Sequence, residues 1–574
     1  MSKNKHRKGR TLFSVAGVIV SFLMILGCGT NPDRPGSAGR ILPDEPFEIA
    51  AGEDGYSLVF EGIPVARLTL PELENAELTE VEFGEPDNGW RRVRLVWDVL
   101  AETQQDELSL PIEILLEPDF WWAPHLTPEE GYVAAQHVFR SPALIVQDGI
   151  RTIALVPDLD SVGKNEENPW FLDFDAVQKK MWVGLVKTDI PEHVLFKKSS
   201  GMMFSPGRAE ISFFITVYND REPVRNPWRK TSAFLWGRWG HHLFVEGEPV
   251  RAPLQTYVRR TYDWAFKSWG RFVWQEFDLN GRRVGAPQFI VNISQSPNYP
   301  EEWYQREFLS IWNQAWFSSL RSASGLYRFA RLNGDEELLR RARLTKELAL
   351  AAPMKDGIFP AVIRTDNGEV EIAGKILQRP EPWEKAYWTN SNRSPRDHGI
   401  KADWYHVLDA SWTCLLMLRW YEDLEQDERL VEYARTYAEK LLILQEDSGF
   451  FPGWLNPDSL EPGPVMNETP ETSMSVTFLL KLSDITNENK YRQAALKAMD
   501  AVLSEIVPHG RWEDFETYWS CCRWGREMYL GRKIERNAMH KQNSFAMFWT
   551  AEALLASYKA TGETPYLHWG RRTL

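Results

Sequence analysis

The chain has 574 residues and a formal net charge of −14, which excludes nucleic acid as a partner because binding a polyanion requires a basic surface. Hydrophobic residues make up 43% of the sequence and charged residues 25%, the balance of a folded protein with a sizeable core. Tryptophan is the outlier at 26 residues. Several tryptophans lie in polar loop sequence, where a flat ring can stack on the face of a sugar.

The first 27 residues have the pattern of a signal peptide. The basic segment "MSKNKHRKGR" precedes the apolar run "TLFSVAGVIVSFLMILG", which ends at Cys28. A small residue directly before this cysteine resembles a bacterial lipobox. The resemblance implies that Cys28 is acylated and anchors the protein in the cell envelope, with residues 28–44 as a flexible tether. An uncleaved membrane span is the alternative, for which the apolar run is short.

Residues 45–245 are expected to form a β-sandwich. The stretch "RRVRLVWDV" alternates apolar and polar residues, and "EISFFITVYND" places its apolar residues on one face. The stretch "ALIVQDGIRTIALV" has two apolar runs around Asp148-Gly149, a hairpin signal. Many short strands with proline and glycine turns are typical of two stacked sheets.

Residues 246–574 carry a helical repeat. Each unit has a nearly apolar helix, a short turn, a helix with one charged face and a glycine-aromatic loop. Gly357, Gly449 and Gly510 occupy equivalent places after the charged helices. The length suits twelve helices, which predicts an (α/α)6 toroid of inner and outer helices. An open solenoid would share the repeat, but long aromatic and acidic loops favour a toroid, whose mouth would gather them.

A sandwich followed by such hairpins resembles the six-hairpin glycosidase and polysaccharide-lyase superfamily. The stretch "PETSMSVTFLL" is similar to the "ETS" helix start of unsaturated glucuronyl hydrolases. It is also similar to the "ETC" of zinc-dependent β-L-arabinofuranosidases, which carry a Cys-Cys pair downstream. That second resemblance implies zinc at Glu471, Cys521 and Cys522, with one cysteine as nucleophile. Because Ser473 replaces a further cysteine ligand, we expect no cofactor and keep zinc as the alternative.

Four carboxyl groups are candidates for the acid and the opposing carboxylate that glycosidases require. Asp403 lies in "KADWYHVLD", and its alternative role is to cap a helix. Glu471 lies at the start of a helix, and its alternative role is to interact with the positive end of the helix dipole. Asp514 and Glu516 lie in "GRWEDFETYWSCCRWG", where aromatic neighbours and like charges would raise one pKa. The alternative there is a hydrated acidic loop with aromatic packing. We expect Asp514 or Glu516 to be the acid, opposed by Glu471 or Asp403.

The expected substrate-binding residues surround these carboxyl groups in the sequence. Aromatic rings would stack on sugars, amide and imidazole groups would bind hydroxyls, and an arginine would bind a uronate carboxylate in bidentate fashion. Each also has an ordinary structural role as its alternative. The residues are Trp512, Trp519, Tyr405, His406, Arg523, His540, Gln542 and Asn543.

The sequence therefore predicts an envelope-bound glycoside hydrolase acting on acidic or plant and algal oligosaccharides. A β-eliminating lyase is the first alternative, with Tyr405, His406 or Tyr518 as its base. A non-catalytic glycan-binding lipoprotein is the second. The expected partners are an oligosaccharide or polysaccharide substrate and, through the lipid anchor, a membrane.

Overall fold

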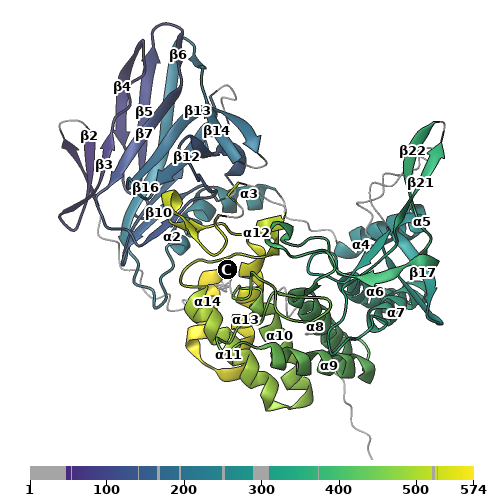
Figure 1. Ribbon diagram of the computed structural model, residues 1–574. Helices are drawn as coiled ribbons and strands as arrows, with labels where there is room; N and C mark the ends of the chain where they lie inside the picture. The colour runs from purple at the N-terminus through teal and green to yellow at the C-terminus, as the bar shows by residue number, and fades with distance from the viewer. Residues whose placement is uncertain are drawn as a thin grey trace, which may run out of the picture.

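The structure is a computed structural model in which a strand-rich half precedes a helix-rich half (Figure 1). The predicted signal peptide, the tether and Cys28 lie outside the described residues. The described residues are 47–52, 55–139, 141–163, 168–192, 195–247, 253–288, 309–372, 374–519, 524–525 and 528–574.

Two antiparallel sheets make up most of the first half. In the described residues, the larger sheet has the order β1 (Glu48–Gly52), β2 (Gly55–Phe60), β3 (Ile63–Thr69), β7 (Glu107–Ile114), β13 (Lys180–Glu192), β12 (Trp170–Asp175), β9 (Tyr132–Ala135), β14 (Leu195–Ser199). The second has the order β4 (Ala76–Phe83), β5 (Trp90–Val99), β16 (Gly207–Asn219), β11 (Arg151–Pro157), β10 (Leu144–Asp148), β8 (Phe120–Trp122). A two-stranded sheet pairs β6 (Thr103–Gln105) with β15 (Met202–Phe204).

One hydrophobic core joins the two sheets. Leu110 and Val183 of the larger sheet belong to the same buried cluster as Leu95 and Ile153 of the second. The predicted hairpin turn at Asp148-Gly149 is confirmed, because it joins β10 to β11. The opposite face of the second sheet is also covered, so β16 is buried on both sides rather than alternating. Its cover is α2 (Trp228–Leu235) with the π-helical turn η2 (Trp236–Gly240), and α3 (His241–Glu246) follows.

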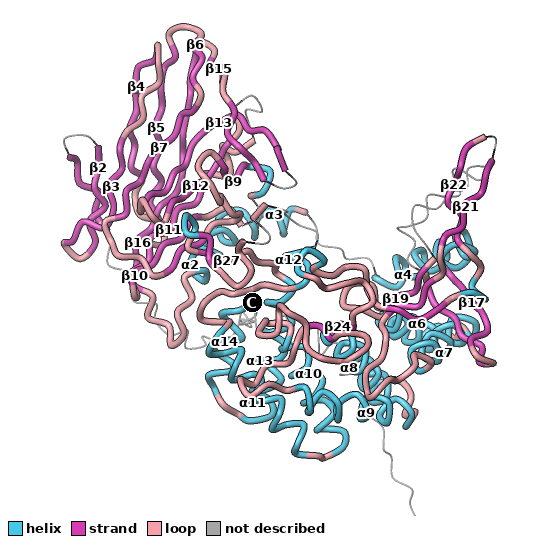
Figure 2. Tube along the Cα trace, in the orientation of Figure 1, coloured by secondary structure: helices cyan, strands magenta, loops and turns pink. Residues whose placement is uncertain are grey.

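Helical hairpins make up most of the second half, and their loops gather on the side that faces the sheets (Figures 1 and 2). The predicted inner and outer helices are confirmed. Inner helix α10 is buried continuously from Thr472 to Leu480, whereas outer helix α11 buries one stripe of residues. In the described residues, the hairpins are α6 (Ser319–Asn333) with α7 (Glu336–Leu350), α8 (Val407–Asp423) with α9 (Glu428–Leu444), α10 (Thr472–Thr486) with α11 (Asn489–Glu505), and α13 (Phe545–Thr561) with α14 (Thr564–Thr573).

Glycines mark equivalent points of the repeat. Gly357 follows outer helix α7 and lies against α9, where an added Cβ would come within 2.6 Å of the Lys440 side chain. Gly449 follows α9 and lies against α11, where an added Cβ would come within 2.8 Å of the Lys497 carbonyl oxygen. Both have positive φ, which favours glycine. The loops at Gly357 and Gly449 therefore pack closely on the next outer helix, whereas an added Cβ at Gly510, after α11, would meet nothing within 4 Å.

The described residues form four such hairpins, fewer than the six that twelve helices would make. The stretch 253–288 holds α4 (Leu254–Asp263), the turn η3 (Trp264–Ser268) and α5 (Gly270–Val273), followed by the strand pair β17 (Trp274–Leu279) and β18 (Arg282–Pro287). Asn280 and Gly281 join these strands with positive φ at both residues, the two-residue hairpin turn that Asn-Gly favours. The helical repeat predicted for residues 246–574 does not contain this strand pair.

Short strands and turns complete the helical half. Their bounds are β19 (Ser310–Trp312), β20 (Val362–Arg364), β21 (Asn367–Ile372), β22 (Lys375–Pro380), η5 (Trp383–Lys385), β23 (Tyr387–Thr389), η6 (Arg396–His398), β24 (Tyr405–His406), β25 (Trp454–Leu455), α12 (Phe515–Trp519), β26 (Lys533–Ile534), η7 (Glu535–Asn537) and β27 (Met539–His540). One further turn, η1 (Gln136–Val138), lies in the strand-rich half.

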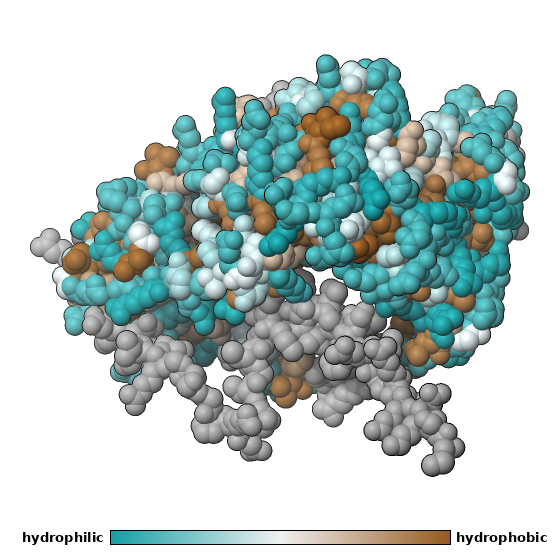
Figure 3. Space-filling view, turned by 90° about the horizontal axis from the view of Figure 1, so that it is seen from below, coloured by the Kyte–Doolittle hydropathy of each residue, from teal (hydrophilic) through white to brown (hydrophobic). Residues whose placement is uncertain are grey.

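The two halves meet through the segment between β26 and β27. Arg536 forms a bidentate pair with Asp173 of β12, at 2.9 and 2.8 Å. The Asn537 amide oxygen accepts from the Thr127 backbone N–H at 3.1 Å, and Met539 belongs to the core of the sheets. Seen from below, the surface is mostly hydrophilic with separated hydrophobic spots (Figure 3). Within the described ranges, the helices are all too short or too polar to cross a bilayer.

Candidate functional site: a buried carboxylate–imidazole cluster

Two inner helices bring the first pair of site residues together. His406 directly precedes α8, and Glu471 directly precedes α10. The two helices pack side by side and begin at the same end, so these side chains meet: His406 Nε2 lies 3.1 Å from Glu471 Oε2. The pairing of β24 with β25 places Trp454 opposite His406, and the two rings stack at 4.0 Å between centroids. The sequence predicted both His406 and Glu471 as site residues.

Asp409 completes a row of carboxylate, imidazole and carboxylate. Its Oδ2 lies 3.1 Å from His406 Nδ1, and its Oδ1 accepts a hydrogen bond from the Ala315 N–H at 2.8 Å. All three side chains of the row are buried. Burial alone would lower the pKa of His406, but the charges of Asp409 and Glu471 outweigh it and raise this pKa to about 10. His406 is therefore an imidazolium at neutral pH.

Asp514 joins the row from the loop that follows α11. The backbone N–H of Phe515 donates to Glu471 Oε1 at 2.8 Å, which holds this loop against the start of α10. Asp514 is fully buried, and its Oδ1 accepts from the N–H groups of Glu516 and Thr517. Burial and, next, the charge of Glu471 raise the pKa of Asp514 well above its usual range. Its Oδ2 has no hydrogen-bond partner in the part of the chain that the structure describes.

The other two acids of this loop differ from Asp514. Glu516 is buried, and its charge adds to the raised pKa of Asp514. Glu513 is fixed by its neighbours: it accepts from Arg511 Nε at 2.8 Å, from the Gly531 N–H at 2.9 Å and from the Tyr518 hydroxyl. These contacts use both oxygens of Glu513, which suits a structural role.

Asp403 stands outside the buried cluster. Its side chain is exposed in a turn before β24, and its backbone carbonyl accepts from Asn390 Nδ2 at 2.9 Å. It does not cap α8 either, because that helix begins at Val407 with His406 at the capping position. Of the four predicted carboxyl groups, the structure therefore brings Glu471, Asp514 and Glu516 together and leaves Asp403 apart.

The predicted substrate-binding residues fall into separate places. Tyr405 is half-buried beside His406, and burial raises the pKa of its phenol. His540 is buried in β27, where burial lowers its pKa to about 4, so the ring is neutral at pH 7. Arg523 and the side chain of Trp519 lie outside the described residues.

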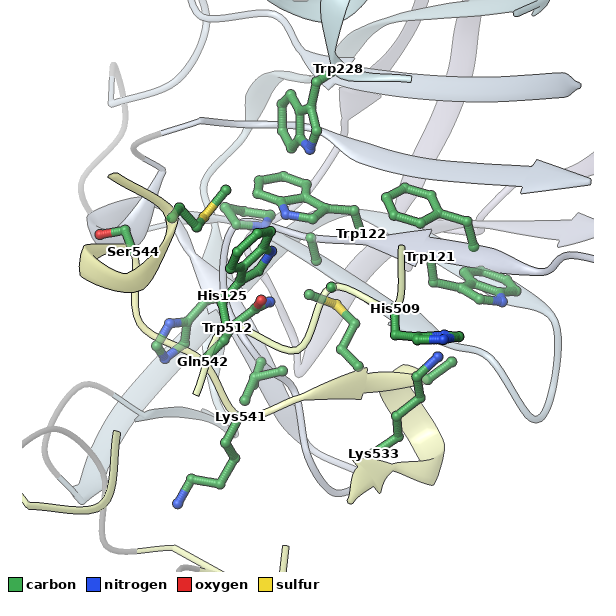
Figure 4. Close-up of a pocket in the computed structure, with 18 of the residues that line it drawn as sticks. Trp121, Trp122, His125, Trp228, His509, Trp512, Lys533, Lys541, Gln542 and Ser544 are labelled. Atoms are coloured by element: carbon green, nitrogen blue, oxygen red, sulfur yellow. The ribbon is translucent and has the colours of Figure 1, made fainter. Parts of the chain in front are cut away.

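Trp512, Gln542 and Asn543 line a cavity between the two halves of the molecule instead of the carboxylate cluster. Figure 4 shows Trp512 and Gln542 in the lining of this cavity. The cavity has a volume of about 600 Å³. One wall comes from the second sheet and α2, with Trp121, Trp122 and Trp228. The other wall comes from the loops before and after α12 in the chain and from the end of α14.

Sequence reasoning missed Asp409, Phe515 and Trp454 as parts of the cluster. Asp409 had a signal, because it lies three residues after His406 on a helix, where side chains meet. Phe515 contributes a backbone N–H, which no side-chain pattern reveals. Trp454 reaches His406 through strand pairing between β24 and β25, a contact that local periodicity does not contain.

The described residues do not provide a metal site. No group of three or more histidine, cysteine, aspartate or glutamate side chains within them could hold a metal ion. Cys521 and Cys522, which the zinc alternative requires, lie outside the described residues. The third member of that set, Glu471, has one oxygen on His406 and the other on the Phe515 N–H.

Comparisons with known proteins give distant structural neighbours only. No family model matches the chain, and the curated proteins gave no match either. One similar solved structure is a GH76 α-mannanase of Bacteroides thetaiotaomicron, with 10% identity, 56% of this chain and 69% of that chain covered, and a TM-score of 0.32. For an unsaturated glucuronyl hydrolase specific for heparin, the identity is 15% and the TM-score is 0.31. The match covers 57% of this chain and 74% of that chain. For a polysaccharide lyase, the identity is 10% and the TM-score is 0.26. The match covers 92% of this chain and 74% of that chain. At these scores the neighbours carry no argument on function, which we derive from the side chains of the cluster.

Proposed function

We propose that the protein is a carbohydrate-active enzyme, a glycoside hydrolase acting on uronic-acid-containing or plant and algal oligosaccharides. In this proposal the two sheets form a β-sandwich and the helical hairpins an array of the toroid class, with the cluster at its mouth. One observation carries the proposal: Glu471 Oε2 lies 3.1 Å from His406 Nε2, whereas Asp514 is fully buried, and burial and the charge of Glu471 raise the pKa of Asp514 well above its usual range. Glycosidases need such a pair of carboxyl groups, one ionised and one protonated.

Each member of the cluster has a defined role in this reaction. Asp514 acts as the general acid and gives its proton to the oxygen of the glycosidic bond as that bond breaks. Glu471, as a carboxylate, acts on the anomeric carbon either directly or through a water molecule. His406 and Asp409 are positioning residues, because they hold Glu471 through a charged row rather than touching the sugar. Both carboxyl groups are buried, so in this proposal the loop that carries Asp514 opens to admit the substrate.

The lyase alternative is disfavoured by its own candidate bases. A β-elimination needs a group that takes up a proton near neutral pH. His406 is already protonated between two carboxylates. Burial raises the pKa of both phenols, those of Tyr405 and Tyr518, and Tyr518 donates its hydrogen to Glu513.

Hydrolysis of a glycan panel by carboxyl variants tests the proposed function. We expect Asp514→Asn to slow turnover by about 10²–10⁴-fold, because it removes the proton donor. Asp403→Asn is the matched control, since this exposed carboxyl lies outside the cluster, and it should keep full activity. Products without an unsaturated uronate identify a hydrolase rather than a lyase. Full activity of Asp514→Asn, or products that carry an unsaturated uronate, would contradict the proposal. Glycan binding by the wild type without turnover would favour the non-catalytic glycan-binding alternative.

We also propose that the protein is lipid-anchored in a bacterial cell envelope. The support is the basic segment, the apolar run and Cys28, which resemble a lipoprotein signal. An anchored enzyme would act on oligosaccharides at the membrane surface.

A further inference from the structure

The cavity between the sheets and the helices adjoins the carboxylate cluster through Thr517, which lines the cavity and donates its N–H to Asp514 Oδ1, but the side chains of the cluster itself lie outside the cavity. Neither Glu471, His406, Asp409 nor Asp514 is among the residues that line it. Its volume of about 600 Å³ lies within the range of about 300–1,000 Å³ that is usual for small-molecule sites. It also sits at a junction between two structural units, where such sites are common.

Aromatic rings give this cavity flat walls in fixed orientations. Trp122 and Trp228 meet edge to face, with 3.8 Å between centroids and an interplanar angle of 87°. Trp512 faces them from the helical side (Figure 4). The backbone carbonyl of Trp512 accepts from the Asn543 N–H at 2.9 Å, which fixes this segment. Gln542 lies next to Asn543 on the same wall and brings a side-chain amide, a group that both donates and accepts hydrogen bonds.

The charge of the lining is opposite to that of the whole protein. The described lining holds four lysine or arginine side chains and one acid, Asp119, although the chain has a net charge of −14. Asp119 is already paired with Arg225 at 2.7 Å. The cavity therefore has an excess of positive charge, which attracts an anion.

Arg572 is the most informative of these cations. Its guanidinium donates to two backbone carbonyls, those of Arg225 at 2.6 Å and Val507 at 2.9 Å. No carboxylate in the described part of the chain lies within ion-pair distance of it. Burial and the charge of Arg225 lower its pKa to about 10, so it remains charged at neutral pH. A partly desolvated guanidinium beside a cavity is best satisfied by a bound carboxylate.

We propose that this cavity is a second carbohydrate site, which binds a uronate-bearing end of an oligosaccharide between the two halves of the protein. The tryptophans cover the faces of a sugar ring, Gln542 binds its hydroxyls, and the cations receive its carboxylate. The inference deepens the proposed function, from which the choice of a carbohydrate follows. It places acidic-glycan recognition in a site apart from the carboxyl groups that break the bond.

Calorimetric titration of the full chain carrying Asp514→Asn tests this site without hydrolysis. The probes are oligogalacturonate, oligomannuronate and methyl-esterified oligogalacturonate, which lacks the charge. We expect at least one charged probe to bind, and the esterified probe to bind at least tenfold more weakly. Trp122→Ala and Gln542→Ala should each weaken the charged probe by about tenfold or more, because contacts central to a site dominate affinity. Trp236→Ala is the matched control, since Trp236 is 51% exposed and does not line the cavity.

Four outcomes would overturn the site. Three of them are no binding of either charged probe, equal binding of the esterified probe, and unchanged binding in both cavity variants with melting temperatures like that of the parent. Binding lost only on Glu471→Gln would place the glycan at the cluster and also overturn the cavity site. The hydrolysis test fails or succeeds independently, because it follows turnover by the wild type and by Asp514→Asn alone.

Discussion

At the scale of single residues, the proposed chemistry depends on the charges of one buried group of side chains. His406 was expected to bind substrate, but it lies between Asp409 and Glu471, out of contact with solvent. The sequence could predict which residue types gather at the starts of inner helices, because a repeat fixes those positions. It could not predict the exposure of Asp403 or the complete burial of Asp514, since both depend on how distant loops cover the helix ends.

The pH dependence of stability follows from the same residue. The pKa of His406 is about 10 in the folded protein and about 6.5 when unperturbed, so folding takes up a proton between these values. Its stabilising effect is fully present below pH 6.5 and is lost as the pH rises through 10, by at most about 1.4 kcal/mol per pH unit. Melting temperatures of the wild type and of His406→Gln should therefore differ most near pH 6.5 and converge by pH 10. A gap that stays constant or widens over this range would show that His406 is not held as a cation.

At the scale of elements, helices were easier to predict than the strand pairs among them. The periodicity of apolar residues in the sequence predicts long amphipathic helices such as α9 and α11. The hairpin β17–β18 was missed because the helical repeat was extended over it, although Asn280-Gly281 is a strong local turn signal. Pairs such as β24–β25, two residues each, arise from packing between loops far apart in the chain.

Glycine substitutions test the packing between successive hairpins. Gly449→Ala should destabilise the protein by about 1–3 kcal/mol, because φ is +101° and the new Cβ would meet the Lys497 carbonyl oxygen at 2.8 Å. Gly510→Ala is the control, with positive φ but open space around the Cβ, and should cost about 1 kcal/mol. Thermal unfolding of both variants gives the comparison. Equal losses would mean that the contact between the Gly449 loop and α11 adds nothing to stability.

At the scale of the whole molecule, the junction between the two halves is the feature that could not be predicted from the sequence. Thr127 and Asn537 are hydrogen-bonded across a separation of 410 residues. Nothing in the local pattern of either segment indicates this partner. The junction also explains why Trp512, Gln542 and Asn543, predicted near the catalytic carboxyl groups, line the cavity instead.

The proposed anchor is tested on the full-length protein expressed in a bacterium. Cys28→Ser removes the thiol that would be acylated, so we expect the protein to move from the membrane fraction to the soluble fraction. Immunoblots of both fractions give the measurement, and Cys414→Ser serves as the control because that cysteine is buried in the helical core. Unchanged membrane association of Cys28→Ser would mean that another feature holds the protein there.

The central claim is that one buried carboxyl group is protonated at neutral pH beside an ionised partner. Infrared spectroscopy measures this directly, because a protonated carboxyl group has a carbonyl band distinct from the bands of a carboxylate. At pH 7 the wild type should show this band, Asp514→Asn should show it with lower intensity, and Asp403→Asn should retain its full intensity. The absence of the band from the wild type, or an unchanged intensity in Asp514→Asn, would contradict the assignment of Asp514 as the general acid.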